Sequence, residues 1–180
     1  MKNGKMLRTL LVTAGLMAAL SLTACGKEEA VSTDTSAATT TVTTEKKVTG
    51  KTESYGNFSE VLIPEGMVLK AGKLDDHDDP NVFWIQRSDN EAHYYMIRIE
   101  DEATCISSVT QTKDANKGAQ DVNFTAGEMN WSGAAYKYND VMDSFQIYGK
   151  QGERFILVSA GWHSVDEDVT KAIMGSIKIK

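Results

Sequence analysis

Apolar and polar residues alternate along most of the chain after residue 55, which is the spacing of β-strands whose two faces meet different surroundings. Turn-forming residues such as Pro64, Gly66 and Gly152 separate the alternating segments. This pattern predicts strands at residues 58–63, 67–71, 82–87, 93–100, 143–149 and 153–161. The pairs 82–87 with 93–100 and 143–149 with 153–161 are predicted to be hairpins. Residues 127–138 are predicted to form a bent strand or a strand pair, because glycines interrupt them.

Two segments carry helical signals. Residues 101–114 are predicted to form a short or irregular helix, because Thr and Ser lower their helix propensity. A second helix is expected after Ser164, which can form a capping box with Glu167. Its apolar stripe consists of Val165, Val169, Ala172 and Ile173. Gly175 ends this helix, and residues 176–180 alternate as a final strand. The expected fold class is α+β, an antiparallel β-sheet packed with a C-terminal helix and one short or irregular helix.

The composition of the chain changes near residue 55. Residues 31–48 consist mainly of Ser, Thr and Ala, and every Trp, Tyr and Phe lies at Tyr55 or later. A segment without large apolar side chains cannot bury enough surface to offset the entropy that it loses on ordering. We therefore expect a disordered Thr/Ser-rich tether at residues 25–54 and a single folded domain at residues 55–180.

The first 25 residues have the features of an export signal. An apolar stretch at residues 10–20 is shorter than the ~20 residues that a membrane-spanning helix needs. The basic residues that precede this stretch are Lys2, Lys5 and Arg8. The sequence Leu-Thr-Ala-Cys then ends at Cys25. This segment resembles the signal peptides of bacterial lipoproteins. The resemblance implies removal of residues 1–24, lipidation of Cys25, and a lipid anchor in the cell membrane with the protein on its extracytoplasmic side.

Charge and cysteine content narrow the choice of partners. The chain has a formal net charge of −6, and loss of residues 1–24, with three basic and no acidic residues, would lower it to −9. An acidic surface repels phosphate backbones, so nucleic acid is excluded as a partner. If Cys25 is lipidated, Cys105 has no intramolecular partner for a disulfide. Its apolar neighbour Ile106 favours a buried thiol of low reactivity over a reactive one.

The polar clusters of the sequence do not form a known catalytic or metal-binding pattern. Residues 75–79 are Asp-Asp-His-Asp-Asp, but the segment lacks the glycine and the glutamate that an EF-hand calcium loop requires. We therefore expect a solvated acidic loop and no metal site there. His77, His93 and His163 lie in separate segments without zinc-ligand spacing. Neither a Gly-x-Ser-x-Gly motif nor a glycine-rich phosphate loop occurs. The sequence thus predicts no catalytic residues and no cofactor.

Aromatic side chains are the remaining candidates for a functional surface. Exposed rings on one face of a sheet can stack on sugars or anchor a protein partner. Buried rings would instead fill the core, and this second interpretation is favoured for most of these residues. The candidate binding residues are Trp84, Trp131, Trp162, Tyr136 and Tyr138, with Tyr94 as a further member.

Residues 55–180 resemble the PsbP-like family. The segments that carry the resemblance are residues 63–67, 131–138 and 145–158, and the closing helix with residues 176–180. The resemblance implies an antiparallel sheet packed with helices. It implies no shared activity, since known members dock on protein partners through their surfaces. The succession of lipoprotein signal, Thr-rich tether and this domain is also similar to small uncharacterised lipoproteins of Gram-positive anaerobes.

These features together predict a lipid-anchored, extracytoplasmic, non-enzymatic domain that binds or scaffolds another component of the envelope. The expected partners are the membrane, through the lipid anchor, and an envelope protein or a cell-wall component. The domain is expected to be a monomer. An envelope enzyme and a lipoprotein that binds a small molecule or an ion are the alternative hypotheses.

Overall fold

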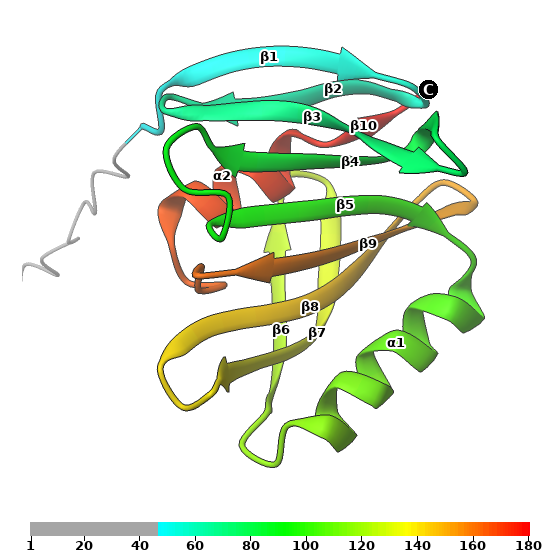
Figure 1. Ribbon diagram of the computed structural model, residues 1–180. Coiled ribbons are helices and arrows are strands. Elements are labelled where there is room, and N and C mark those ends of the chain that lie inside the picture. The colour runs from blue at the N-terminus through cyan, green and yellow to red at the C-terminus, as the bar shows by residue number, and fades with distance from the viewer. Residues whose placement is uncertain (1–46) are drawn as a thin grey trace, which may run out of the picture. The chain divides into compact units, whose positions relative to one another are not determined.

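The structure is a computed structural model that describes residues 47–180 (Figure 1). The predicted signal peptide, the lipidation of Cys25 and most of the predicted tether lie outside the described residues. No helix within residues 47–180 is long and apolar enough to span a bilayer. The elements in chain order are β1 (Gly50–Tyr55), β2 (Phe58–Pro64), β3 (Met67–Leu74), β4 (His77–Arg87), β5 (Tyr94–Glu100), α1 (Glu102–Ala115), β6 (Gln120–Ala126), β7 (Met129–Tyr138), β8 (Met142–Gln151), β9 (Arg154–Gly161), α2 (Asp168–Ser176) and β10 (Lys178–Ile179).

Seven strands form one antiparallel sheet in the order β3-β4-β5-β9-β8-β7-β6, called the large sheet below. The pairing of β4 with β5 and of β8 with β9 confirms both predicted hairpins. β7 is one continuous strand and not a strand pair, and it forms a hairpin with β6, which the sequence pattern did not predict. The apolar face of β6 consists of Val122, Phe124 and the small Ala126, so its alternation is a weak sequence signal. The antiparallel sheet with two helices confirms the α+β class.

Three strands form a second, small sheet in the order β1-β2-β10. β2 contributes Phe58 to the core, where its ring meets Phe83 of β4 edge to face at a centroid distance of 4.8 Å. β10 pairs with β2 through Lys178 and Glu60. The small sheet and α2 together cover one face of the large sheet, which we call the core face (Figure 1).

β1 corrects the predicted boundary between tether and domain. Residues 50–54 were assigned to the disordered tether, but they form a strand that pairs with β2, from Gly50 opposite Pro64 to Tyr55 opposite Phe58. The hydroxyl of Tyr55 donates a hydrogen bond to the carbonyl of Asp79 at 3.1 Å. The assignment failed because β1 is an edge strand with mostly exposed side chains, so it has the composition of a linker. The folded domain therefore begins no later than Gly50.

α1 corrects the prediction of a short or irregular helix. It is a regular helix of 14 residues. Asp101 caps its N-terminus, accepting hydrogen bonds from the amide of Thr104 at 2.8 Å and from its hydroxyl at 2.7 Å. Cys105 and Val109, four residues apart, are buried against the large sheet while the Thr and Ser residues mostly face outward. Packing of one narrow apolar stripe and a good cap thus stabilise a helix that propensity alone does not favour.

α2 forms where the sequence predicts a helix, but it begins later. Half of the predicted capping box is present, because Glu167 accepts a hydrogen bond from the amide of Ser164 at 3.0 Å. The hydroxyl oxygen of Ser164 instead accepts from the amide of Asp166 at 3.3 Å. The hydroxyl of Thr170 donates to the carbonyl of Ser164 at 2.8 Å. These contacts hold residues 164–167 in a turn, so the helix starts at Asp168.

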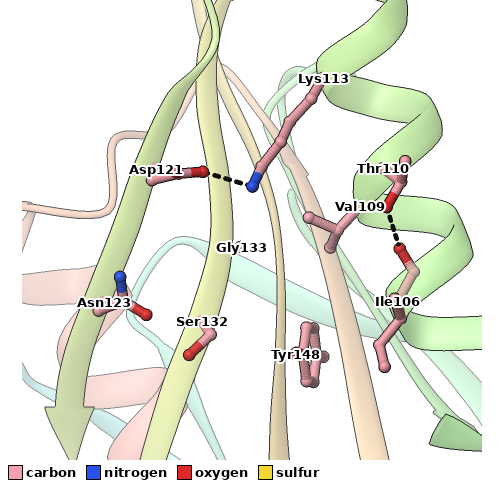
Figure 2. Close-up of a pocket in the computed structure, with 9 residues that line it drawn as sticks. All are labelled: Ile106, Val109, Thr110, Lys113, Asp121, Asn123, Ser132, Gly133 and Tyr148. Atoms are coloured by element: carbon pink, nitrogen blue, oxygen red, sulfur yellow. Dashed lines mark hydrogen bonds and ion pairs between the residues drawn. The ribbon is translucent and has the colours of Figure 1, made fainter.

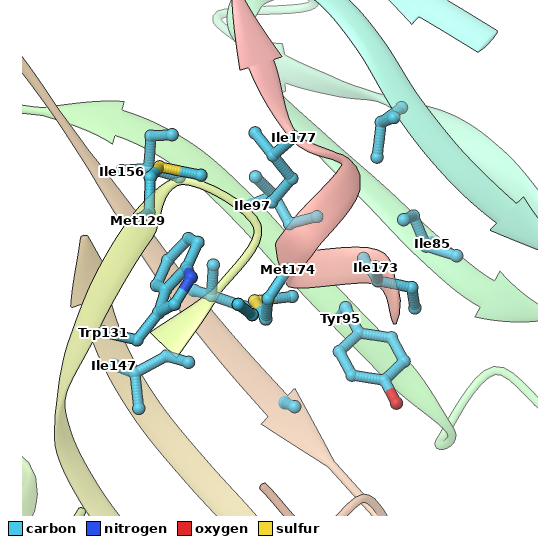
Figure 3. Close-up of a cluster of buried hydrophobic side chains, with 14 of the residues drawn as sticks. Ile85, Tyr95, Ile97, Met129, Trp131, Ile147, Ile156, Ile173, Met174 and Ile177 are labelled. Carbon is cyan, nitrogen blue, oxygen red and sulfur yellow. The ribbon is translucent and has the colours of Figure 1, made fainter. Parts of the chain in front are cut away.

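The main core lies between the core face, the small sheet and α2. Trp131 of β7 is its largest side chain and is 0% exposed. Its indole lies over Gly149 of the neighbouring β8, where an added Cβ atom would come within 3.1 Å of the ring. Figure 3 shows the indole among residues of β4, β5, β8, β9 and α2. The labelled core residues are Ile85, Tyr95, Ile97, Met129, Trp131, Ile147, Ile156, Ile173, Met174 and Ile177.

Candidate functional site: the aromatic face

The second face of the large sheet is only partly covered. α1 packs there over β7, β8 and β9, where Cys105 and Val109 contact Ala134 and Leu157. No other helix of the described chain packs on this face. Side chains on β4, β5 and the far ends of β7 and β8 are therefore left without a covering layer.

Four aromatic residues occupy this uncovered area, and we call them the aromatic face: Trp84, Tyr94, Tyr136 and Tyr138. Trp84 on β4 meets Tyr94 on β5 edge to face, with ring centroids 5.1 Å apart and planes at 61°. Tyr136 and Tyr138 lie two residues apart on β7, so both point to the same side of the sheet. Trp84, Tyr94 and Tyr136 are half-buried, and Tyr138 is 51% exposed.

Small residues lie between two of the rings. Strand register places Tyr94, Gly161, Ser144 and Tyr136 in one row across β5, β9, β8 and β7. A Cβ atom on Gly161 would come within 2.8 Å of the Tyr94 ring, which shows that the ring covers this glycine. Ser144 is only 4% exposed although no helix of the described chain covers it. We call this row of two tyrosines with two small residues between them the platform.

The hydroxyl groups of the aromatic face are free to bind. Of the six tyrosines, Tyr55 and Tyr95 use their hydroxyls in hydrogen bonds within the domain. The hydroxyls of Tyr94, Tyr136 and Tyr138 form no hydrogen bond with any residue in the range 47–180. Burial raises the pKa of Tyr136, and the nearby phenols of Tyr94 and Tyr138 act in the same direction. The hydroxyl of Tyr136 therefore remains a protonated donor at neutral pH.

Charged residues around the aromatic face are neutralised by partners. Lys70, which pairs with Trp84 across the β3–β4 ladder, forms an ion pair with Glu91 at 2.5 Å. Arg98 of β5 contacts Glu100 at 3.4 Å. At the end of β7, Lys137 and Asp143 pair at 2.6 Å. The surface consequently combines aromatic rings and hydroxyls with little net charge.

The structure places the candidate binding residues in three different parts of the domain. Trp84, Tyr136 and Tyr138 are brought together on the aromatic face, with Tyr94 as the ring that joins them. Assignment of Trp131 to a binding surface is wrong, because this residue is 0% exposed and lies in the core. Trp162 is 45% exposed but stacks on His93, outside the aromatic face. The two small residues of the platform were missed, and a glycine that ends a strand was their only sequence signal.

Trp162 belongs to a second cluster, at the end of the core face. Its backbone has a φ of 63°, a conformation unusual for a bulky residue. The indole stacks on His93 at 5.4 Å, and the edge of that ring meets His163 at 5.8 Å. His163 in turn stacks on Tyr95 at 4.3 Å. Four rings, from the start of β5, the residue before it and the segment before α2, thus pack in sequence.

His163 contacts the segment at the start of α2. Its Nδ1 lies 3.0 Å from the carboxylate of Glu167, which favours the tautomer with the proton on that nitrogen. Its Nε2 is buried and has no hydrogen-bond partner within the described residues. The backbone amide of His163 also donates to the carbonyl of Asp143, which ties the segment to β8.

Burial of His163 predicts a pH-dependent stability. Burial lowers the pKa of this histidine from its ordinary value of about 6.5, although contact with Glu167 opposes the shift. The unfolded chain then binds a proton more readily than the folded one, so the contribution to stability is complete above pH ~6.5 and is lost as the pH falls toward the folded pKa. We expect the melting temperature to fall between pH 7 and pH 5 more steeply in the parent than in His163→Gln.

The matched control for this experiment is His77→Gln, which replaces an exposed histidine in the β3–β4 turn region. It should keep the steep pH dependence of the parent. If the control and His163→Gln change the profile equally, the pH dependence does not come from the buried imidazole.

A groove lies on the other side of α1, above β6 and β7 (Figure 2). It has a volume of about 380 Å³. Lys113 of α1 and Asp121 of β6 form an ion pair across it. Ile106, 47% exposed, and Tyr148 contribute apolar surface. Its two charged groups already neutralise each other, and it offers one aromatic ring where the aromatic face offers four, so we rank it second.

Two further predictions concern single segments. Cys105 is buried as expected, and burial raises the pKa of its thiol to about 11, with Glu100 and Asp101 acting in the same direction.

Asp75 and Asp76 form the two-residue β3–β4 turn with φ angles of 48° and 66°. Within residues 47–180 no group of three or more His, Cys, Asp or Glu side chains converges in a way that could hold a metal ion.

Comparisons with known proteins leave the function open. No known family matches the chain, and no curated protein matches its sequence. One similar solved structure comes from Bacteroides thetaiotaomicron VPI-5482, with 14% identity and a TM-score of 0.44. The similarity covers 73% of this chain and 48% of the other, so the chain spans about half the length of that protein.

Proposed function

We propose that this protein is a lipid-anchored, extracytoplasmic binding domain without enzymatic activity, and that the aromatic face is its binding surface. The observation that carries the proposal is the uncovered row of rings on the large sheet, with three hydroxyls that have no partner within the domain. Large rings that remain partly exposed on a rigid sheet provide contact area with little loss of conformational entropy on binding. The N-terminal sequence that ends at Cys25 supports the anchor.

The composition of the two aromatic clusters supports binding over catalysis. The aromatic face holds rings, hydroxyls and neutralised ion pairs, which suit recognition. The histidine and carboxylate at His163 and Glu167 are engaged in fixing the start of α2. We also propose that the arrangement of an antiparallel sheet with two helices is PsbP-like, which fits a family whose members act by docking.

The binding half of the proposal is tested with isolated envelopes of the host bacterium. To remove attachment through the lipid, this test uses Cys25→Ser chains. We expect Cys25→Ser to co-sediment with these envelopes, and Cys25→Ser combined with the double variant Tyr94→Ala/Tyr136→Ala to remain in the supernatant. Both substitutions lie on the sheet surface, so the variant should still unfold cooperatively. Ile106→Ala, which removes an exposed apolar side chain from the groove beside α1, is the control and should bind like the parent. Equal sedimentation of the parent and the double variant would exclude the aromatic face as the binding surface.

The anchor half of the proposal is tested at Cys25. Two or more acyl chains give stable membrane attachment where one gives only reversible binding. We expect Cys25→Ser to leave the membrane fraction, either as released protein or as unprocessed precursor of higher mass. The control is Cys105→Ser, which changes the other cysteine and should leave the membrane fraction unchanged. Detergent-phase partitioning of Cys25→Ser at the mature mass would contradict lipidation.

A further inference from the structure

We propose that the aromatic face binds a neutral glycan, laid across the strands from Trp84 to Tyr136. This inference rests on the proposed binding function and names the chemical class of the ligand. Sugar rings have C–H groups on their flat faces and hydroxyls around their edges. A matching surface therefore needs aromatic rings to stack on and hydrogen-bonding groups beside them.

The platform supplies both kinds of group in the required arrangement. Tyr94 lies over Gly161, and Tyr136 stands at the other end of the same cross-strand row. Trp84 on β4 lies opposite Met96 and therefore beside the row, and its ring meets that of Tyr94 edge to face. The hydroxyls of Tyr94 and Tyr136 lie at the rim of these rings and have no partner within the described domain, so they are free to donate to sugar oxygens.

The length of the row indicates an oligomer and not a single sugar. β4, β5, β9, β8 and β7 are consecutive neighbours in the large sheet. The four spacings between them total about 19 Å at ~4.8 Å each. A recess of about 190 Å³ lies beside Tyr136 and Ser144 at the end of the row. Its lining includes Gln120 and Ser164, whose side chains can bind the exocyclic groups of a sugar beyond the stacked rings.

The paired charges near the aromatic face favour a neutral glycan over an anionic polymer. Lys70 and Lys137 near the face are already paired with Glu91 and Asp143, so no free cation is available there for an anionic polymer. The chain as a whole is acidic. A protein partner would anchor large side chains in pockets of the face. Here the positions between the rings are closed, because Gly161 and Ser144 are buried beneath them.

The test measures binding of soluble oligosaccharides by titration calorimetry. The full chain is held in a zwitterionic detergent, which has no sugar headgroup. The probes are the β-1,4-linked hexamers of N-acetylglucosamine and of glucose, with the two monosaccharides for comparison. We expect at least one hexamer to bind and the monosaccharides to show no binding. Tyr94→Ala and Tyr136→Ala should each weaken hexamer binding about tenfold, the loss expected for one aromatic contact.

Two variants keep the result interpretable. Tyr94→Phe retains the ring and removes the hydroxyl, so it should weaken binding less than Tyr94→Ala. Ile106→Ala should bind like the parent, since it lies outside the row. Melting curves of all variants identify any variant that fails to fold. If Tyr94→Ala fails to fold, Tyr94→Phe still tests the role of Tyr94.

The outcomes separate this inference from the proposed function. Envelopes treated with protease should still retain the Cys25→Ser chain, which has no lipid, if the ligand is a glycan. If neither hexamer binds and protease treatment abolishes sedimentation that depends on Tyr94 and Tyr136, the ligand is a protein. The glycan inference then fails while the binding function stands. Hexamer binding that is lost in Ile106→Ala and kept in Tyr136→Ala would place the ligand in the α1 groove and overturn the inference. Sedimentation independent of the aromatic face would overturn both.

Discussion

Replacement of Trp131 by alanine is expected to lower the free energy of unfolding by about 3–5 kcal/mol, the range for loss of a fully buried Trp or Phe. The indole is 0% exposed and fills the space above Gly149, which has no side chain of its own to close the cavity. Neighbouring strands hold the surrounding side chains in place, so the cavity cannot collapse. Denaturant unfolding followed by circular dichroism measures the change.

Two substitutions serve as references for this measurement. Trp84→Ala removes the same kind of side chain from the half-buried aromatic face, so its effect on stability should be much smaller. Trp131→Phe should be milder than Trp131→Ala, because it keeps an aromatic ring in the core and removes an indole N–H that has no hydrogen-bond partner among residues 47–180. Equal destabilisation by Trp84→Ala and Trp131→Ala would contradict the assignment of Trp131 to the core.

A chain that ends at Val165 is expected not to fold. The deletion removes Ile173, Met174 and Ile177, which are all buried against the core face. Loss of each large aliphatic side chain costs about 2–5 kcal/mol, so three together match or exceed the ~5–15 kcal/mol that stabilises a typical domain. It also leaves the amide of Leu62 without the hydroxyl of Ser176, its acceptor at 2.7 Å. Loss of the cooperative thermal transition, recorded by circular dichroism, is the expected result.

A chain that ends at Ile177 is the control for this truncation. It keeps α2 and all three buried residues and loses only the short β10, which pairs with β2 at two positions. It should fold with a lowered melting temperature. If the chain ending at Val165 melted like the parent, α2 could not be part of the core.

The elements that sequence reasoning found are those with local causes. The β4–β5 and β8–β9 hairpins are each set by two alternating segments and the turn between them. β1 and α1 were misjudged because their stability comes from distant packing. Tyr55 is held by contacts with Phe83 and Asp79, and Cys105 is buried by Leu157. Such contacts leave no trace in the periodicity of the strand or the helix itself.

The candidate site illustrates the same limit. Alternation along β7 shows that Trp131 and Tyr136 point to opposite sides of a strand, but it does not show which side is covered. Coverage depends on where α1 and α2 pack, and that is decided by the whole sheet. Cross-strand register also had to be known before Tyr94 and Tyr136 could be placed in one row.

The pairing of β2 with β10 constrains the biogenesis of this protein. Ser59 and Lys178 hydrogen-bond across 119 positions of the sequence. Synthesis proceeds from the N-terminus, so a nascent chain can form the local hairpins early. It cannot close the core face until Ile173 and Ile177 have left the ribosome. Until that moment Trp131 and its neighbours stay open to water, and the chain remains loosely structured. A chaperone that meets the chain before that point would therefore encounter an exposed apolar sheet, which is the kind of surface that aggregates when it is left uncovered.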